Sequence, residues 1–243
     1  LLPAEKALSA QEIAQRSENN LRSDRTVMKA RMVVVSPRIT QPREMEFTSW
    51  DDREGERSFV RMEAPSKDRG TGFLKLHPNL WMYIPRVERT MRIPPSMMLQ
   101  SWMGSDFTND DLVRDSSETK DYRHRLLGIE TEVEGHPGRQ AYLLEYIPHE
   151  EAPVVWGRIL AWIDVERGVV LEQEFYDEDG EKLRTMRFED IRPVDDRWVP
   201  HRWTMTPENK EGHQTVIEIK RMDFDAKIDD DVFTKRNLRR GVR

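Results

Sequence analysis

The sequence predicts a mainly β (α+β) fold built on one curved antiparallel sheet of about eleven strands. Two patterns predict it. Apolar and polar residues alternate along most of the chain, as in strands with one buried and one wet face. Short glycine turns such as Arg167-Gly168 and Asp179-Gly180 join consecutive segments, which leaves no room for the crossover helices of a parallel sheet. A sheet of this size curls, so we expect it to be closed or partly closed.

An N-terminal helix is expected at about 9–22, because Ser9 and Glu12 have the spacing of a capping box before an apolar face of period 3.6. After this helix the apolar residues recur at every second position, which is the pattern of β-strands. Residues of about 156–226 form an up-and-down meander of hairpins. No break in composition marks a linker, so residues 1–243 are predicted to form a single domain.

A methionine-rich segment of about 95–114 interrupts the strands after the pair Pro94-Pro95. Methionine is flexible and polarizable, and it suits a surface that must fit several apolar shapes. The alternative is an ordinary core helix. The position of the segment within a chain of strands favours a helical lid or plug over the concave face of the sheet, with the two prolines as its hinge.

The apolar strand faces and this lid define the predicted ligand site. Its residues are Met45, Phe47, Leu74, Trp81, Met82, Tyr83, Ile84, Met91, Met97, Met98, Trp102 and Met103. Because side chains alternate along a strand, a shift of one residue would exchange Met82 for its neighbours Trp81 and Tyr83 in the lining. The seven tryptophans of the chain either pack the sheet or form the wall of an apolar cavity.

Composition argues against several classes of function. The net charge of -6 disfavours nucleic acid as a partner, and without cysteine there is no disulfide, thiolate site or catalytic thiol. The six histidines lack the spacing of metal ligands, and neither a nucleophile elbow nor a phosphate loop is present. No apolar run reaches the roughly 18 residues of a transmembrane helix. We therefore expect no metal, no cofactor, no transmembrane segment and no enzymatic activity.

Several short motifs follow one another along the chain. They are Gly70-Thr71-Gly72, Leu80-Trp81-Met82-Tyr83-Ile84-Pro85, Arg92-Ile93-Pro94, Met103-Gly104-Ser105-Asp106-Phe107, Asp110-Asp111-Leu112 and the ending Phe233-Thr234 with Leu238. In this order they resemble the outer-membrane lipoprotein-sorting family of the LolA/LolB superfamily, and the resemblance extends from about Ala10 to Asn237. The resemblance implies an incomplete β-barrel whose concave apolar face is covered by helices and accepts acyl chains.

The resemblance also implies a periplasmic protein that carries a lipid or the acyl anchor of a lipoprotein towards the outer membrane. Its partners would be an inner-membrane exporter and an outer-membrane acceptor. Two alternatives stay open: a binding or adaptor subunit of an RND-type exporter, and a cavity enzyme such as a lipid hydrolase. The start at Leu1 suits a mature exported protein whose signal peptide is removed, and the missing lipoprotein cysteine suits a protein without a lipid anchor.

Overall fold

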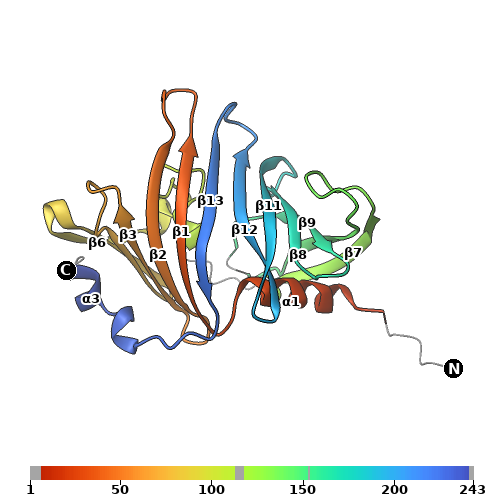
Figure 1. The fold of residues 1–243 in the computed structure, drawn as a ribbon, viewed down its shortest axis with the longest axis horizontal. Helices are drawn as coiled ribbons and strands as arrows, with labels where there is room; N and C mark the ends of the chain where they lie inside the picture. Colours follow the sequence, from red (N-terminus) through yellow and green to blue (C-terminus); the bar gives the residue numbers. More distant parts are fainter. Residues whose placement is uncertain (1–6, 113–117, 153, 241–243) are drawn as a thin grey trace. The chain divides into compact units, whose positions relative to one another are not determined.

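Thirteen strands form one antiparallel sheet in the computed structural model, which describes residues 7–112, 118–152 and 154–240 (Figure 1). The strand order is β6-β5-β4-β3-β2-β1-β13-β12-β11-β10-β9-β8-β7. All neighbours follow each other in sequence except β1 and β13. The edge strands β6 and β7 do not pair with each other within the described ranges, so the sheet is open. The mainly β fold is confirmed, with thirteen strands rather than about eleven.

The elements have the following bounds. The helical segments are α1 (Ala10–Leu21), η1 (Pro85–Val87), η2 (Pro95–Met97), α2 (Asn109–Leu112), η3 (Asp230–Phe233) and α3 (Lys235–Arg239). The strands are β1 (Arg25–Val35), β2 (Arg43–Asp52), β3 (Arg57–Ala64), β4 (Gly72–Leu76), β5 (Asn79–Ile84), β6 (Arg89–Ile93), β7 (Tyr122–Glu130), β8 (Ala141–Pro148), β9 (Arg158–Asp164), β10 (Val170–Tyr176), β11 (Lys182–Val194), β12 (Arg197–Pro207) and β13 (Gln214–Asp223).

The chain packs as two compact units, whose boundary falls within β12. The first unit comprises residues 1–21 and 116–200, and the second comprises residues 22–115 and 201–243. Both contribute strands to the sheet. The single domain inferred from the sequence stays a prediction, and each unit is described by itself below.

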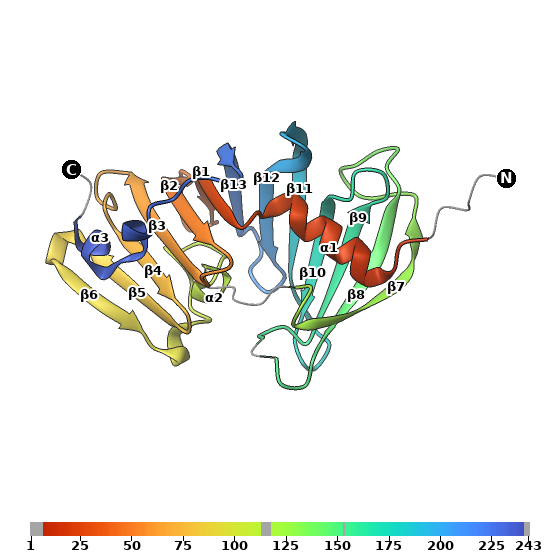
Figure 2. The same ribbon diagram turned by 90° about the horizontal axis from the view of Figure 1, so that it is seen from below.

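In the first unit, α1 begins at the predicted capping box. The backbone N–H of Ser9 donates to Glu12 Oε2 over 2.7 Å, and the N–H of Glu12 donates to Ser9 Oγ over 3.1 Å. One face of the helix is buried, with Ile13 and Ala14 among its residues. Figure 2 shows α1 running across the strands of this unit. The helix therefore closes off apolar surface that the strands leave open.

A buried carboxylate fastens the hairpin between β9 and β10. The Asp164 side chain is 1% exposed and receives two bonds from Arg139, Nε to Oδ2 over 2.6 Å and Nη2 to Oδ1 over 2.8 Å. The backbone N–H groups of Glu166 and Arg167 also donate to Asp164 Oδ1. Burial alone would raise the pKa of Asp164, but these bonds outweigh it and lower the pKa below its ordinary value of 3.8.

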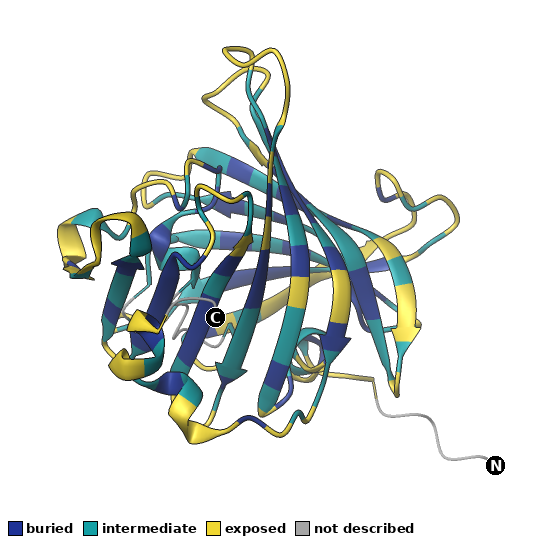
Figure 3. Cartoon of the chain, turned by 60° about the vertical axis from the view of Figure 1, so that its left-hand side comes forward, coloured by how far each residue is buried: buried dark blue, intermediate teal, exposed yellow. Residues whose placement is uncertain are grey.

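In the second unit, the alternation of side chains gives the sheet two different faces. Phe47 is opposite Met62, and Phe73 is opposite Met82, so these four side chains share one face. Figure 3 shows the alternation as bands of buried residues separated by half-buried and exposed ones along the strands. Short helical segments lie on both faces of this unit, η2 and α2 on one and η3 and α3 on the other (Figure 2).

The methionine-rich segment is not the continuous helix predicted from the sequence. The 3₁₀ turn η2 ends at Met97, the short helix α2 begins at Asn109, and residues between them form turns. The backbone N–H of Trp102 bonds forward to Phe107 O over 2.8 Å, so the chain doubles back where a helix would continue. The last residues of the predicted segment, 113 and 114, lie outside the described residues.

Candidate ligand-binding face

One face of the second unit is apolar across its strands, and we call it the apolar face. Its strand residues include Ala30, Met32, Val34, Met45, Phe47, Val60, Met62, Phe73, Leu80, Met82, Ile84, Met91, Ile93, Ile217 and Ile219. Met32, Met45 and Met62 are 0% exposed, whereas Met82, Ile84 and Met91 are half-buried. The face is thus rich in methionine and only partly covered towards β5 and β6.

Trp102 covers the centre of the apolar face. Its ring makes edge-to-face contacts with Phe47 at 5.4 Å and with Phe73 at 5.8 Å between centroids. Such aromatic pairs stabilise the packing beyond what the burial of apolar area contributes. Trp102 is 2% exposed, while Met97, Met98 and Met103 of the same segment are half-buried and Leu99 is 60% exposed. The segment therefore lies over the sheet through one aromatic anchor with flexible methionines around it.

The Met-Gly-Ser-Asp-Phe motif folds the covering segment locally. Met103 and Gly104 have φ of 50° and 70°, the left-handed region that suits a tight turn and favours glycine. Ser105 Oγ donates to Trp102 O over 2.7 Å and accepts from the N–H of Phe107 over 3.2 Å. Ser105 is 1% exposed, so these bonds satisfy groups that water does not reach. The motif fixes where Trp102 points.

Two polar contacts tie the covering segment to the sheet. On β2, Arg43 Nη2 donates to the carbonyl of Met103. On β13, Thr215 Oγ1 donates to Asp106 Oδ2 over 2.7 Å and accepts from the N–H of Asp106 over 2.9 Å. The backbone hydrogen bonds described for this segment close within it, as from Trp102 N–H to Phe107 O and from Asn109 N–H to Gln100 O. The segment can separate from the sheet at a lower cost than a strand, whose backbone is paired along its length.

Two buried side-chain nitrogens at the apolar face, Trp102 Nε1 and Arg43 Nε, have no hydrogen-bond partner among the described residues. Leaving such a donor unpaired costs roughly 1–3 kcal/mol. Lys75, 5% exposed, adds a cationic side chain to the same face, because its strand neighbour in register is Leu80. The face therefore carries polar groups beside its apolar surface.

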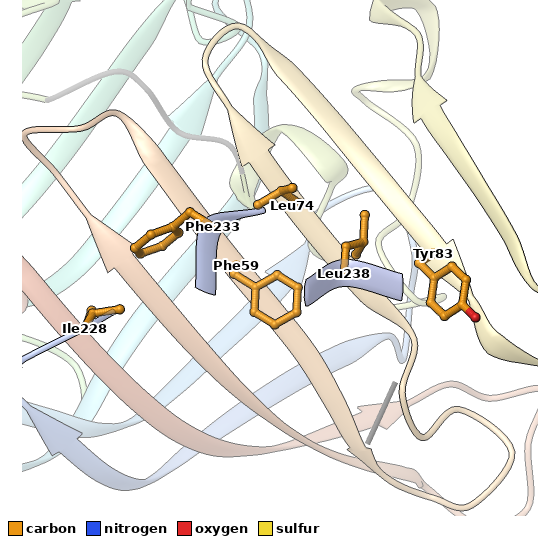
Figure 4. Packing of buried hydrophobic residues seen from close by; sticks show 6 residues of the cluster. All are labelled: Phe59, Leu74, Tyr83, Ile228, Phe233 and Leu238. Carbon is orange, nitrogen blue, oxygen red and sulfur yellow. The ribbon is translucent and has the colours of Figure 1, made fainter. Parts of the chain in front are cut away.

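Three residues of the predicted site lie on the opposite face. Leu74 and Tyr83 belong to a cluster with Phe233 and Leu238 of the C-terminal segment, and Trp81 packs against it (Figure 4). Lys235 Nζ lies 3.5 Å from the centroid of the Trp81 ring. The other nine predicted residues lie on the apolar face or in the segment that covers it. Among their neighbours, Met32, Met62 and Phe73 were missed, since only the cross-strand register brings them there.

Charged groups hold the C-terminal segment on that opposite face. Asp230 accepts from Arg57 Nη2 at 2.5 Å and from Arg25 Nη2 at 3.2 Å, and Arg57 also binds the buried Asp52 at 2.8 Å. Burial would raise the pKa of Asp52, but the bonds from Gly55 N–H and Arg57 lower it below its ordinary value. These bonds keep Leu74 and Tyr83 under the C-terminal segment.

In the described part of the chain, no three His, Cys, Asp or Glu side chains come together as metal ligands. Across the same residues, no helix has the length and apolar character needed to cross a membrane.

A family profile described as uncharacterized protein matches residues 54–240. The match covers more than half of the chain, so the chain belongs to this family of uncharacterized proteins. Among curated proteins, no similar sequence was found.

Solved structures agree over almost the whole chain. A putative outer membrane lipoprotein-sorting protein domain from Vibrio parahaemolyticus is 26% identical, with a TM-score of 0.78 over 95% of this chain and 98% of its own. A DUF1329 family protein from Desulfovibrio piger is 21% identical, with a TM-score of 0.82 over 94% and 97%. A LolA superfamily protein from Nitrosomonas europaea is 23% identical, with a TM-score of 0.77 over 95% and 100%. The last two show the shared fold.

Proposed function

We propose that this protein is a non-enzymatic periplasmic carrier that binds a lipid, or the acyl anchor of a lipoprotein, on the apolar face of its second unit. The observation that supports this proposal is the segment that covers the apolar face: it is irregular, and its described backbone hydrogen bonds close within it rather than with the methionine-rich strands below. The likeness to a lipoprotein-sorting domain supports the same class of cargo. The proposed carrier role thus depends on an apolar surface that the covering segment can leave and that an acyl chain can then cover.

The free energy available is sufficient for carriage through water. Burying an acyl chain contributes about 0.8 kcal/mol per methylene, so about ten methylenes contribute on the order of 8 kcal/mol before ordering costs. The acyl chain would take the place of the Trp102 ring against Phe47 and Phe73. Because methionine side chains adapt their shape, several chain lengths would fit.

Binding of a fluorescent fatty acid to the purified protein tests this function. We expect saturable binding near one acyl chain per protein, and competition by a diacylated lipopeptide but not by the same peptide without acyl chains. Native mass spectrometry should show the acylated species bound. Absence of binding for both acylated ligands would contradict the carrier role and favour the alternative, an adaptor subunit of an exporter.

A further inference from the structure

The strand β7 forms an exposed apolar edge in the first unit. Among the described residues its strand partner is β8 alone, and α1 contacts it at His124 through Gln11, so one row of its backbone N–H and C=O groups has no neighbouring strand in that part of the chain. Three large hydrophobic residues lie exposed in it: Leu126 is 41%, Leu127 is 42% and Ile129 is 57% exposed. At nine residues and without proline, β7 is also longer than the five-residue edge strand β6. Such an edge is a template for another strand.

A β-bulge changes the alternation of side chains along β7. Leu126 is opposite Leu144 of β8 and Gly128 is opposite Leu143, so Leu127 is the extra residue. Residues paired in register have their side chains on the same face of the sheet. Along β8, Tyr142 and Leu144 lie on one face, and Ala141 and Ile147 lie on the other. Leu126 and Ile129 consequently lie on one face of β7, and Arg123 and Glu130 lie on the other.

This arrangement makes the edge complementary to itself. When two β7 strands meet antiparallel about a twofold axis with Arg123 opposite Glu130, His124 is opposite Ile129 and Arg125 is opposite Gly128. The bulge places both members of each of these pairs on the same face. Two arginine–glutamate pairs then flank the centre, where leucines of both copies meet, and no like charges are opposed. Opposite charges directly across strands contribute roughly 0.2–1 kcal/mol each.

We propose that β7 pairs with β7 of a second copy of this chain, forming a twofold dimer through the edges of the first units. The occupant is a second copy because the charges at the two ends of the strand have opposite sign and match under twofold symmetry. Pairing satisfies the exposed backbone row of each edge and covers Leu126 and Ile129.

Charge exchange between Arg123 and Glu130 tests the dimer. The full chain is examined by sedimentation velocity over a wide range of concentrations, and a concentration-dependent dimer is expected. Either Arg123→Glu or Glu130→Arg places like charges across both ends and should weaken dimerisation by at least about tenfold. The double variant, Arg123→Glu with Glu130→Arg, exchanges the charges and should restore it.

The control is Glu178→Arg, which makes the same change of charge at an exposed hairpin residue of the same unit and should leave dimerisation unchanged. Circular dichroism checks the fold of every variant. A chain that stays monomeric at all concentrations would overturn the proposal. So would a dimer that the single changes do not weaken, or one that the double variant fails to restore.

Discussion

Replacing Met91 by glutamate is expected to weaken binding of the fluorescent fatty acid by at least about a hundredfold. The side chain of Met91 lies on the apolar face, opposite Met82, and is half-buried. An acyl chain seated there would bury the new carboxylate without a partner, which costs several kcal/mol, and about 2.8 kcal/mol is already a hundredfold in the dissociation constant. Because Met91 is half-buried in the free protein, the variant should still fold.

Thr90→Glu is the matched control. Thr90 precedes Met91 on β6, is also half-buried and lies on the opposite face, opposite Tyr83. The same negative charge is introduced one residue away, so a general electrostatic effect would appear in both variants. Fatty acid affinity should stay within about threefold of the unchanged protein in Thr90→Glu. Equal loss in the two variants would contradict the assignment of binding to the apolar face.

The second large effect concerns stability. We expect Asp164→Asn to lower the free energy of unfolding by about 3 kcal/mol at neutral pH, measured by urea denaturation. Asp164 is buried and bonded twice to Arg139, so the substitution removes the buried counter-charge of the guanidinium and leaves it the exposed Glu166 at 3.2 Å. The amide NH2 group that would replace Oδ2 is a donor, so it also cannot accept the bond from Arg139 Nε.

The pH dependence of this difference has a definite sign. Since the folded protein lowers the pKa of Asp164, the folded state binds its proton less readily than the unfolded state. The stability that Asp164 contributes is therefore fully present above its ordinary pKa of 3.8 and is lost as the pH falls through the lower, folded value. The gap between the unchanged protein and Asp164→Asn should narrow over that acid range. A gap that is constant there would show that the ion pair does not stabilise the fold.

Most of the fold could be predicted from the sequence because its signals are local. The hairpin turns at Gly168, Gly180 and Gly212 have φ of 66°, 84° and 72°, the conformation that glycine alone adopts at low cost. The capping box of Ser9 and Glu12 likewise needs only residues three apart. The number of strands is thirteen rather than about eleven, and the short strand β4 around Leu74 is among those that alternation indicates.

The conformation of the covering segment was predicted less accurately than the strands. Its apolar composition suggests a helix, whereas hydrogen bonds of its polar side chains stabilise turns. Ser101 and Thr108 form an isolated bridge, and Ser105 bonds the backbone of Trp102, which competes with helical hydrogen bonds. Leu74 and Tyr83 were included in the predicted ligand site because alternation within one strand separates its two faces. It does not tell which face lies under the methionine-rich segment and which lies under the C-terminal segment. The cluster of Leu74 and Tyr83 with Leu238 depends on a contact more than 150 residues away in the chain.

Photo-crosslinking with a fatty acid that carries a diazirine along its chain, followed by peptide mass spectrometry, tests the acyl-binding role most directly. If the acyl chain occupies the apolar face, label should appear on residues such as Met82, Met91 and Trp102, and an excess of unlabelled fatty acid should remove it. Label confined to Trp81 and the C-terminal segment, or label that excess ligand does not displace, would contradict binding at this face.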